Sequence, residues 1–508
     1  GGGSGGTSGA PTGFNFGGGP SAGGGGGKFS FGVKDQGNGG ALKRKSDEPA
    51  APRVKRKAIP RSGQDPGEVL IAGNGDCGQM GLGEDGVREC VKPTLIPDLS
   101  QAKAIAVCCG GMHTVVVTSA GQVWTWGCND DAALGRDGDE TLPGLVQGPM
   151  AHQRVTAVCA GDSHTAALLD DGRVFSWGTY KDSNGIIGYA PNGSGGAVKK
   201  AEAPVLVKEL QGVHITSIAS GSNHTLAVAR GSTELFAWGC GEQGQLGRTV
   251  EKKENIAALV PRRPGLVVGG AAGGGSLRVL NANFLTHLEA LHKADPSGDW
   301  TDAMDEFLAH RRSVGAGGSG VGGVGGSQGG GVEMEAVAAG SYCSFAIATD
   351  GQVWAFGLNN MGQLGIGSTD SSTTPRKITG LSHVSMISAG EHHTTALTKD
   401  GDVFVFGRGD QSQLGLGDGK ALHESPQRLS SISTCGVVKV CCGSYQSSAI
   451  TDTGDLYTWG FGESFQLCNG KSADADTPFL VTGDPVGAMR VLDVGMGGQH
   501  TVLLAKSE

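Results

Sequence analysis

The sequence contains no stretch of eighteen or more apolar residues, and this absence excludes a membrane-spanning helix. It also lacks an excess of positive charge: the formal net charge is −9, which argues against a protein that binds nucleic acid over its whole surface. The twelve cysteines include no C-x-x-C pair, and Cys108-Cys109 and Cys441-Cys442 lie in apolar runs. We therefore expect reduced, mostly buried cysteines in a soluble protein that uses no metal and no cofactor.

Glycine, in contrast, is in excess. Its 93 copies concentrate before about position 41 and around 315–331, a composition typical of disordered linkers. Two basic clusters follow the first of these segments, namely Lys43, Arg44 and Lys45, and then Lys55, Arg56 and Lys57. Nuclear import receptors recognise such a pattern, and a merely solvated tail is the alternative. We expect residues 1–66 to form a disordered tail with a nuclear localisation signal.

An internal repeat decides the expected fold. A hydrophobic run, a small residue, Gly, two variable residues and usually His recur seven times. The glycines of this signature are Gly110, Gly161, Gly221, Gly340, Gly390, Gly443 and Gly497, at intervals of 51, 60, 119, 50, 53 and 54 residues. One interval therefore holds an insertion, at about 250–335. Apolar residues at helical spacing predict two short helices within it, over 281–294 and 300–312.

Each signature is followed by an alternating strand-like run, a turn, and a second strand that ends in Trp-Gly or Phe-Gly. The second copy, TAALLDDGRVFSWG (165–178), places Asp-Gly between alternating residues, which predicts a hairpin. Four short strands in about fifty residues are typical of a propeller blade. Residues 69–83 hold only the second half of a repeat and residues 490–506 only the first half. We therefore predict an all-β, seven-bladed propeller over 67–508, in which N- and C-terminal strands close the ring.

Three local patterns suggest chemistry that the repeat argues against. GNGDCG (73–78) and GCGEQG (239–244) match a dinucleotide-binding fingerprint, but no helix pattern follows either of them. Asp162, Ser163 and His164 are the residue types of a hydrolase triad, but neighbours on a strand point to opposite faces. The histidines of the repeat suggest a metal site, yet a seven-fold ring spreads them apart, and hydrogen bonding within blades is the alternative. We expect no catalytic residue.

The quoted residues carry a resemblance to a known family. GGMHT, AGDSHTAAL, DDGRVF, GCGEQGQLGR and GGQHTVLL closely resemble the regulator of chromosome condensation, over roughly residues 67–506. The resemblance implies a nuclear guanine-nucleotide exchange factor for the Ran GTPase, without covalent chemistry, with one propeller face on Ran and the other on chromatin. The plant ultraviolet-B receptor of the same superfamily has Trp after the signature glycine in its sensing repeats. Here that position holds Gly111, Asp162, Ser222, Ser341, Glu391, Ser444 and Gly498, so a light sensor is not expected.

One spacing within the chain departs from the others. From the glycine of Trp-Gly or Phe-Gly to the glycine of the next Leu-Gly the distance is 8 residues in most blades, as in Gly127 to Gly135, but 10 from Gly178 to Gly188. The longer segment matches the family's β-wedge, the protrusion that presses on the nucleotide-binding region of Ran; a longer turn is the alternative. The expected wedge contacts are Tyr180, Lys181, Asp182, Ser183, Asn184, Gly185, Ile186 and Ile187.

Further partner contacts follow from the resemblance. Asp162, His393 and His500 match the family's Ran-contacting positions, and His113 lies in the same column. Asn223 stands where the family often has Asp, which puts a carboxylate role there in doubt. The loop after GQLGR matches in place the family's chromatin-facing loop, and its cations Arg248, Lys252, Lys253, Arg262 and Arg263 are expected to bind histones or DNA, unless the loop is merely solvated.

The expected partners are thus Ran, the nucleosome and a nuclear import receptor, and the expected location is chromatin in the nucleus. FNFG (14–17) and FSFG (29–32) resemble nucleoporin repeats. The alternative function is a propeller scaffold or adaptor of the same superfamily that exchanges no nucleotide.

Overall fold

The computed structural model describes residues 65–83, 88–188, 190–191, 197–248, 278–280 and 333–507. Several expectations fall outside these residues. They are the basic clusters Lys43–Lys45 and Lys55–Lys57, the helices at 281–294 and 300–312, and the loop cations Lys252, Lys253, Arg262 and Arg263.

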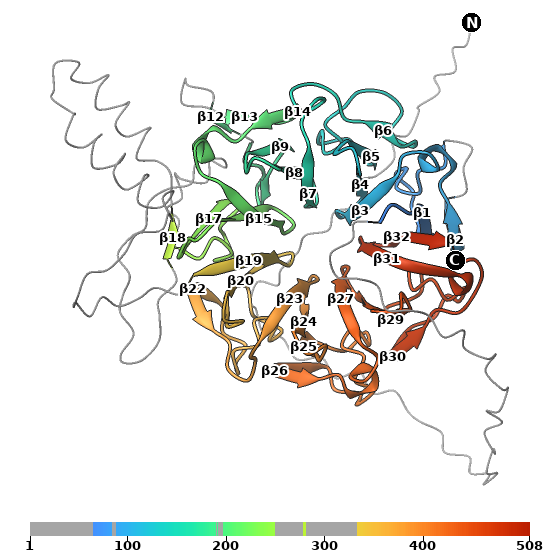
Figure 1. Cartoon of the computed structure of the whole chain (residues 1–508). Coiled ribbons are helices and arrows are strands. Elements are labelled where there is room, and N and C mark those ends of the chain that lie inside the picture. Colours follow the sequence, from blue (N-terminus) through green and yellow to red (C-terminus); the bar gives the residue numbers. More distant parts are fainter. Residues whose placement is uncertain are drawn as a thin grey trace, which may run out of the picture. The chain divides into compact units, whose positions relative to one another are not determined.

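The described residues confirm the all-β, seven-bladed propeller: seven four-stranded sheets are arranged in a ring (Figure 1). Residues of the seven inner strands line a central channel. The first three blades, each from the channel outward, consist of β3 (Ala104–Cys109), β4 (His113–Thr118), β5 (Val123–Gly127) and β6 (Gly144–Leu145); β7 (Val155–Ala160), β8 (His164–Leu169), β9 (Val174–Gly178) and β14 (Ala201–Leu206); and β15 (Ile215–Ser220), β16 (His224–Ala229), β17 (Glu234–Gly239) and β18 (Arg278–Leu280).

Blades 4 to 6 follow the same order. They consist of β19 (Met334–Ala339), β20 (Cys343–Ala348), β21 (Val353–Gly357) and β22 (Ser372–Lys377); β23 (Val384–Ala389), β24 (His393–Thr398), β25 (Val403–Arg408) and β26 (Leu422–Arg428); and β27 (Val437–Cys442), β28 (Gln446–Thr451), β29 (Leu456–Gly460) and β30 (Ala475–Leu480). Short 3-10 turns, such as η1 (Pro97–Leu99), join some of the strands. In the described part of the chain no helix has the length and apolar character needed to cross a bilayer.

Blade 7 joins the two ends of the propeller chain. Its inner strands are β31 (Met489–Met496) and β32 (His500–Ser507), and its outer strands are β1 (Glu68–Asn74) and β2 (Glu89–Leu95). β1 pairs antiparallel with β32, from Glu68 opposite Ala505 to Gly73 opposite His500. The predicted closure of the ring is therefore confirmed.

Glycine at the signature position is required by a close approach between blades. A Cβ on Gly110 would lie 2.3 Å from the carbonyl oxygen of Gly161, and a Cβ on Gly161 would lie 2.5 Å from that of Gly221. The same relation continues around the channel and closes with Gly497, whose Cβ would lie 2.9 Å from the carbonyl oxygen of Gly110. Backbone hydrogen bonds join the same loops, including Gly498 N–H to Gly111 O at 3.2 Å. The seven copies thus form one closed ring of tightly packed backbone.

The inner strands line the channel, and one carboxylate there links three blades. Asp493 of β31 forms an ion pair with Lys439 of blade 6, and its Oδ2 accepts a hydrogen bond from the backbone N–H of Val107 in blade 1 at 3.2 Å. Asp493 therefore ties the composite blade to both of its neighbours. All twelve cysteines are free; most are buried or half-buried, and Cys77 is exposed.

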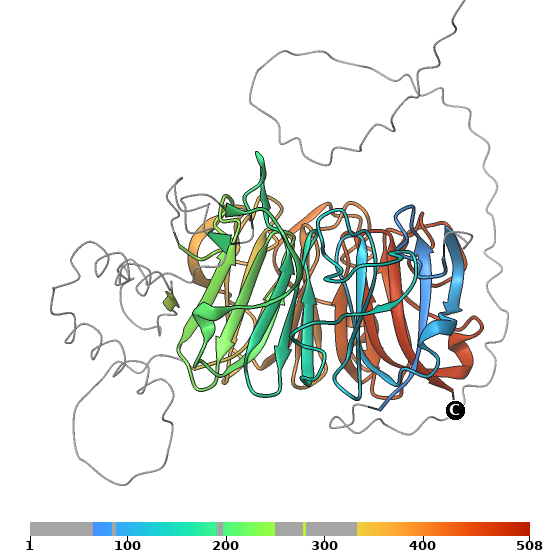
Figure 2. The same cartoon turned by 90° about the horizontal axis from the view of Figure 1, so that it is seen from above.

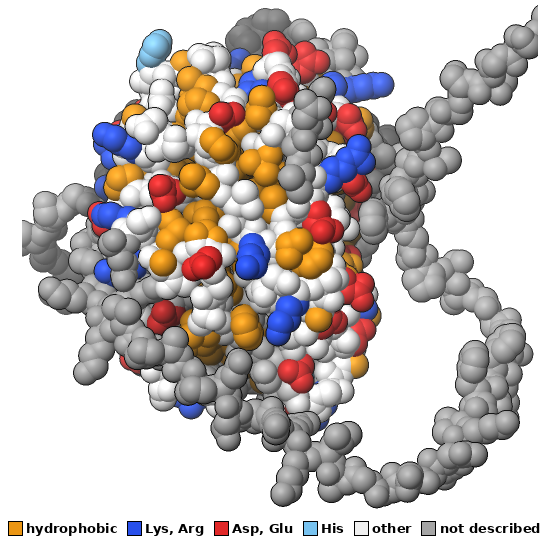
Figure 3. Space-filling model, turned by 90° about the vertical axis from the view of Figure 1, so that its right-hand side faces the viewer, with side chains coloured by type: hydrophobic (Ala, Val, Ile, Leu, Met, Phe, Trp, Pro, Cys, Tyr) orange, Lys and Arg blue, Asp and Glu red, His pale blue; other side chains and the backbone are white. Residues whose placement is uncertain are grey.

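The outermost strands carry a second repeated device. Five of these outermost strands contain a proline at the place where the pairing register with the neighbouring strand shifts. These residues are Pro93, Pro204, Pro375, Pro426 and Pro478. Proline has no N–H to offer to a further strand, so it protects an open sheet edge. On the rim beside β2, apolar side chains alternate with charges of both signs (Figure 3). Val91, Leu95 and Phe479 are exposed on the outer strands of blades 6 and 7.

Candidate functional site

The two additional residues of blade 2 form a separate hairpin. β10 (Lys181–Asp182) and β11 (Gly185–Ile186) pair antiparallel, with Lys181 opposite Ile186. The N–H of Asn184 donates to Asp182 Oδ1 at 2.8 Å, which stabilises the turn. Figure 2 shows this hairpin, in teal green, projecting beyond the other loops of one propeller face. We refer to residues 179–188 as the wedge.

The base of the wedge is anchored by Tyr180, whose side chain is completely buried. Its ring lies against that of His164, with centroids 4.3 Å apart, and its hydroxyl lies 3.1 Å from Thr225 Oγ1. The indole N–H of Trp238 donates to the same hydroxyl at 2.9 Å. Burial raises the pKa of Tyr180 to about 12, so the phenol stays protonated. The side chain of Tyr180, for which a contact with Ran is expected, points inward in this structure and holds the wedge on blades 2 and 3.

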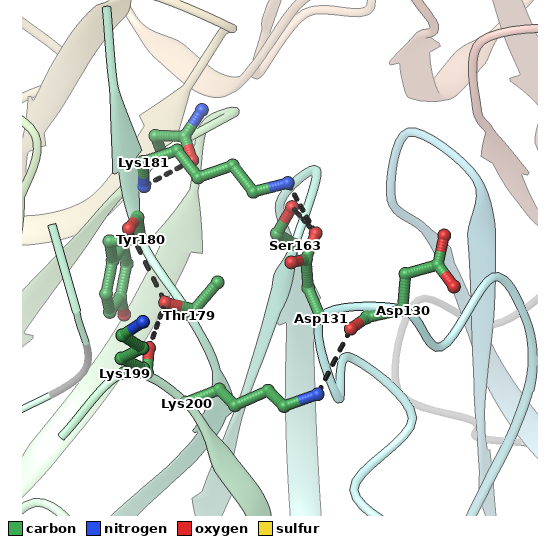
Figure 4. Close-up of polar contacts among 9 residues, drawn as sticks. Asp130, Asp131, Ser163, Thr179, Tyr180, Lys181, Lys199 and Lys200 are labelled. Carbon is green, nitrogen blue, oxygen red and sulfur yellow. Dashed lines mark hydrogen bonds and ion pairs between the residues drawn. The ribbon is translucent and has the colours of Figure 1, made fainter. Parts of the chain in front are cut away.

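Neighbouring blades hold the wedge from both sides (Figure 4). Lys181 Nζ forms an ion pair with Asp131 of blade 1 at 2.5 Å, and Ser163 Oγ donates to the same carboxylate at 2.8 Å. On the other side, the N–H of Lys181 donates to Asn223 Oδ1 of blade 3 at 2.9 Å. Asn223 thus supports the wedge from blade 3.

The upper part of the wedge is open to solvent. Ser183, Asn184, Gly185 and Ile186 are exposed, Ile186 with 47 % of its surface, and Asp182 and Ile187 are half-buried. An exposed apolar side chain at the tip of a braced hairpin is suited to insertion into another protein. Of the expected wedge contacts, the residues from Lys181 to Ile187 are accessible in part or in full.

The mouth of the channel on the wedge side holds two carboxylates, Asp162 and Glu391. Asp162 reaches solvent, yet the crowded protein around it desolvates the carboxyl and raises its pKa, and Glu391 adds to this effect. Burial and a hydrogen bond with Glu391 raise the pKa of the half-buried Tyr445. The guanidinium of Arg408 lies 5.9 Å from the centre of the Tyr445 ring. The mouth is thus an acidic rim with aromatic and basic side chains at one side.

The three histidines expected to contact Ran are buried, with at most 1 % of their surface exposed. Each Nε2 bonds a hydroxyl of the next blade: His113 to Thr165 at 2.9 Å, His393 to Ser447 at 2.8 Å, and His500 to Thr114 at 3.1 Å. Burial lowers the pKa of His113 and of His500 to about 4 and that of His393 to about 3. In this structure the three side chains pack between blades and do not reach the surface.

The alternative chemistries receive no support from the described geometry. His164 Nε2 bonds Thr225 Oγ1 at 3.0 Å, whereas Ser163 bonds Asp131, so no nucleophile and base face each other. In the residues that the structure describes, no group of three His, Cys, Asp or Glu side chains is arranged to hold a metal ion.

Of the loop cations, the structure describes Arg248, which is half-buried. It follows Gly247 as Arg136 follows Gly135 in blade 1. The guanidinium of Arg136 donates to the carbonyls of Thr125, Asp139 and Leu142 at 2.7 to 3.0 Å from Nη2. The contact of Arg248 with chromatin stays a prediction.

A sequence profile of the RCC1-like domain matches residues 68–283 and 313–503. The chain belongs to the RCC1-like family. Among its relatives, the regulator of chromosome condensation of Mus musculus is 36 % identical over 481 residues, which cover 92 % of this chain and 98 % of the mouse protein. A Saccharomyces cerevisiae relative named guanine nucleotide exchange factor SRM1 is 26 % identical over 86 % of this chain and 87 % of its own length.

Solved structures of the RCC1-like family agree with this fold. The crystal structure of Prp20p from Saccharomyces cerevisiae, described with its binding properties to Gsp1p and histones, superimposes with a TM-score of 0.69 at 26 % identity, over 87 % of this chain and 92 % of Prp20p. Yeast RCC1 (Prp20) bound to Kap60 gives a TM-score of 0.67 at 25 % identity, over 91 % of this chain and 97 % of that chain.

Proposed function

We propose that this protein is a guanine-nucleotide exchange factor for Ran, and that it displaces nucleotide without covalent chemistry by pressing the wedge against the nucleotide-binding region. The observation that carries the proposal is the projecting, braced hairpin in a member of a family whose yeast relative is named an exchange factor. Asp162 at the channel mouth lies on the same face as the wedge, because His164 pairs with Gly178 at that end of the blade.

The mechanism requires only differential binding. A protein that binds empty Ran more tightly than loaded Ran must weaken nucleotide affinity by the same factor, because coupling between two ligands is reciprocal. The accessible residues from Lys181 to Ile186 compete for the region that the nucleotide occupies, and Asp162 contributes to docking. Rigidity matters here, since a flexible hairpin would lose ordering entropy on contact.

Deleting Ser183 and Asn184 tests the wedge. The deletion leaves Asp182-Gly185 as a two-residue Asp-Gly loop between the paired Lys181 and Ile186, a favoured hairpin connection. The anchor Tyr180 stays in place, so circular dichroism and the denaturation midpoint should be close to those of the parent. Release of a fluorescent guanine nucleotide from saturating Ran should fall by orders of magnitude.

Asp162→Ala provides the comparison. Because this side chain serves docking rather than displacement, the variant should raise the Ran concentration needed for half-maximal rate more than it lowers the maximal rate. If the parent protein accelerates nucleotide release from Ran no more than a buffer control, the function is that of a scaffold. If the shortened wedge releases nucleotide as fast as the parent, the wedge mechanism is wrong.

We further infer that the protein works on chromatin in the nucleus. Prp20p is described as binding histones, and yeast RCC1 has been solved with Kap60. The loop cations Arg262 and Arg263 are proposed to contact the nucleosome, and the clusters Lys43–Lys45 and Lys55–Lys57 are proposed to bind an import receptor.

A further inference from the structure

The tip of the wedge is bound by a residue from a different blade. The backbone N–H of Ser183 donates to one carboxylate oxygen of Glu242 at 2.9 Å, and Ser183 Oγ donates to the other oxygen at 2.7 Å. Glu242 lies in the loop that follows β17 of blade 3, 59 residues further along the chain. Two bonds to two oxygens of one carboxylate fix both the position and the tilt of the turn.

The isolated hairpin has little stability of its own. β10 and β11 form only two residue pairs, and a two-stranded hairpin in water is at best marginally stable. Its base is held by Tyr180 and by the Lys181–Asp131 ion pair, but both lie before the turn. Beyond the base, the turn hydrogen bond to Asp182 is local to the hairpin, whereas the Glu242 carboxylate belongs to a separate blade.

Acidic side chains occupy the same loop position in other blades, and they bond elsewhere. Asp410, three residues after Gly407, receives two hydrogen bonds from Arg408 within its own blade, at 2.6 and 2.9 Å. Glu242 stands three residues after Gly239, and its carboxylate is directed across the blade boundary to the wedge instead. The acidic side chain at this position therefore bonds within its own blade in blade 5, whereas in blade 3 it bonds to the wedge.

We infer that Glu242 is a positioning residue for nucleotide release: it holds the wedge in the tilt that reaches the nucleotide-binding region of Ran. This inference rests on the proposed exchange function. Without the Glu242 carboxylate the turn would still reach Ran, but it would have to be ordered during the displacement step, at an entropic cost. The loss should therefore fall on the maximal rate rather than on docking.

Glu242→Ala is expected to lower the rate of nucleotide release at saturating Ran by roughly three- to tenfold, as for the loss of two charge-assisted surface hydrogen bonds. The Ran concentration for half-maximal rate should stay within about twofold of the parent value. Glu463→Ala is the matched control, since Glu463 is the exposed glutamate three residues after Gly460 in blade 6. It removes the same charge and should leave both parameters unchanged.

Two further measurements separate positioning from direct contact with Ran. Ser183→Ala should lower the rate in the parent background and have no further effect when Glu242 is already Ala, because the hydroxyl bond is then absent. In the protein without Ran, the amide hydrogen of Ser183 should exchange faster in Glu242→Ala than in the parent.

Additive effects of the two substitutions, or a changed half-maximal Ran concentration with an unchanged maximal rate, would overturn the inference. So would unchanged exchange of the Ser183 amide. The amide measurement does not involve Ran. If the parent protein fails to accelerate nucleotide release, the proposed function is wrong, and the amide measurement still tests whether Glu242 holds the wedge.

Discussion

The indole N–H of Trp238 donates to the side-chain hydroxyl of Tyr180 at 2.9 Å. Three equivalent tryptophans donate to a backbone carbonyl of the preceding blade instead: Trp126 to Gln79, Trp177 to Ala133 and Trp459 to Gln413. In blade 3 the phenol of Tyr180 takes the place of that carbonyl as the acceptor. The elongated loop of blade 2 could therefore arise without leaving a buried donor unpaired.

Tyr180→Phe removes this acceptor and leaves the Trp238 N–H buried without its partner. We expect the free energy of unfolding to fall by about 1–3 kcal/mol, the usual penalty for an unsatisfied buried donor. Denaturant titration followed by tryptophan fluorescence measures it. Tyr342→Phe, at a half-buried tyrosine, is the control and should cost less. Equal losses in the two variants would contradict the role assigned to the hydroxyl.

The buried histidines predict a pH dependence of stability. In the folded protein burial lowers the pKa of His393 to about 3 from the usual 6.5, so the unfolded chain binds the proton more readily. Stability is therefore unaffected by this group above about pH 6.5, and falls as the pH drops from there toward the folded-state pKa, by about 1.4 kcal/mol per pH unit for each such histidine.

His393→Gln should reduce that slope between pH 6.5 and 4, because glutamine does not titrate. Blade 6 already uses this residue: Gln446 occupies the same column and donates to the carbonyl of Gly497 at 2.9 Å. Urea denaturation midpoints measured across this range provide the slope. His152→Gln, at an exposed histidine outside the column, should leave it unaltered. A slope identical to the parent's for His393→Gln would show that this histidine is not held neutral.

Two adjacent glycines test the ring around the channel. A Cβ on Gly497 would lie 2.2 Å from the ring of His500 and 2.9 Å from the carbonyl of Gly110, whereas a Cβ on Gly498 would find its nearest atom at 3.3 Å. Gly497→Ala should destabilise the propeller by about 1–3 kcal/mol or more, as overpacking does, and Gly498→Ala by clearly less. Thermal or urea unfolding measures both losses of stability. A larger loss for Gly498→Ala than for Gly497→Ala would refute the packing argument.

Binding to chromatin should depend on the loop after Arg248. Replacing Arg262 and Arg263 by Ala is expected to weaken nucleosome binding and to flatten its dependence on salt, as the loss of cationic contacts does. Replacing the exposed Arg376 and Lys377 of β22 by Ala removes the same charge elsewhere. Equal affinities for the two double variants would indicate that the loop is merely solvated.

Nuclear entry should depend on the tail. Neutralising Lys43 to Lys45 together with Lys55 to Lys57 is expected to leave a fluorescent fusion in the cytoplasm, because an import receptor reads clustered positive charge. Microscopy compares the location of this fusion with that of a control fusion in which Arg376 and Lys377 are replaced by Ala. Nuclear accumulation of the neutralised protein would refute the assignment.

The fold could be predicted from the sequence because each blade repeats the same steric need. Gly110 and its equivalents mark an approach of backbones, and the half repeats at the two ends have no other arrangement that completes a sheet. The site was predicted less well. A histidine that recurs in most blades looks the same whether it serves packing or a partner, and Tyr180 in an elongated loop gives no sign that it points inward. Glu242 was not predicted from the sequence because its contact with Ser183 joins residues of different blades.

The pairing of β1 with β32 also has a consequence for synthesis. Glu68 pairs with Ala505, so the blade that closes the ring cannot form until residue 505 has left the ribosome. Until then the N-terminal strand has one open edge, and Asp493, which ties blades 6 and 1 together, has not yet been made. A product truncated before residue 490 would keep six potential blades but no closure, and it would present that open edge to other strands and to quality-control proteases. Closure of the ring therefore requires that β31 and β32 have been synthesised.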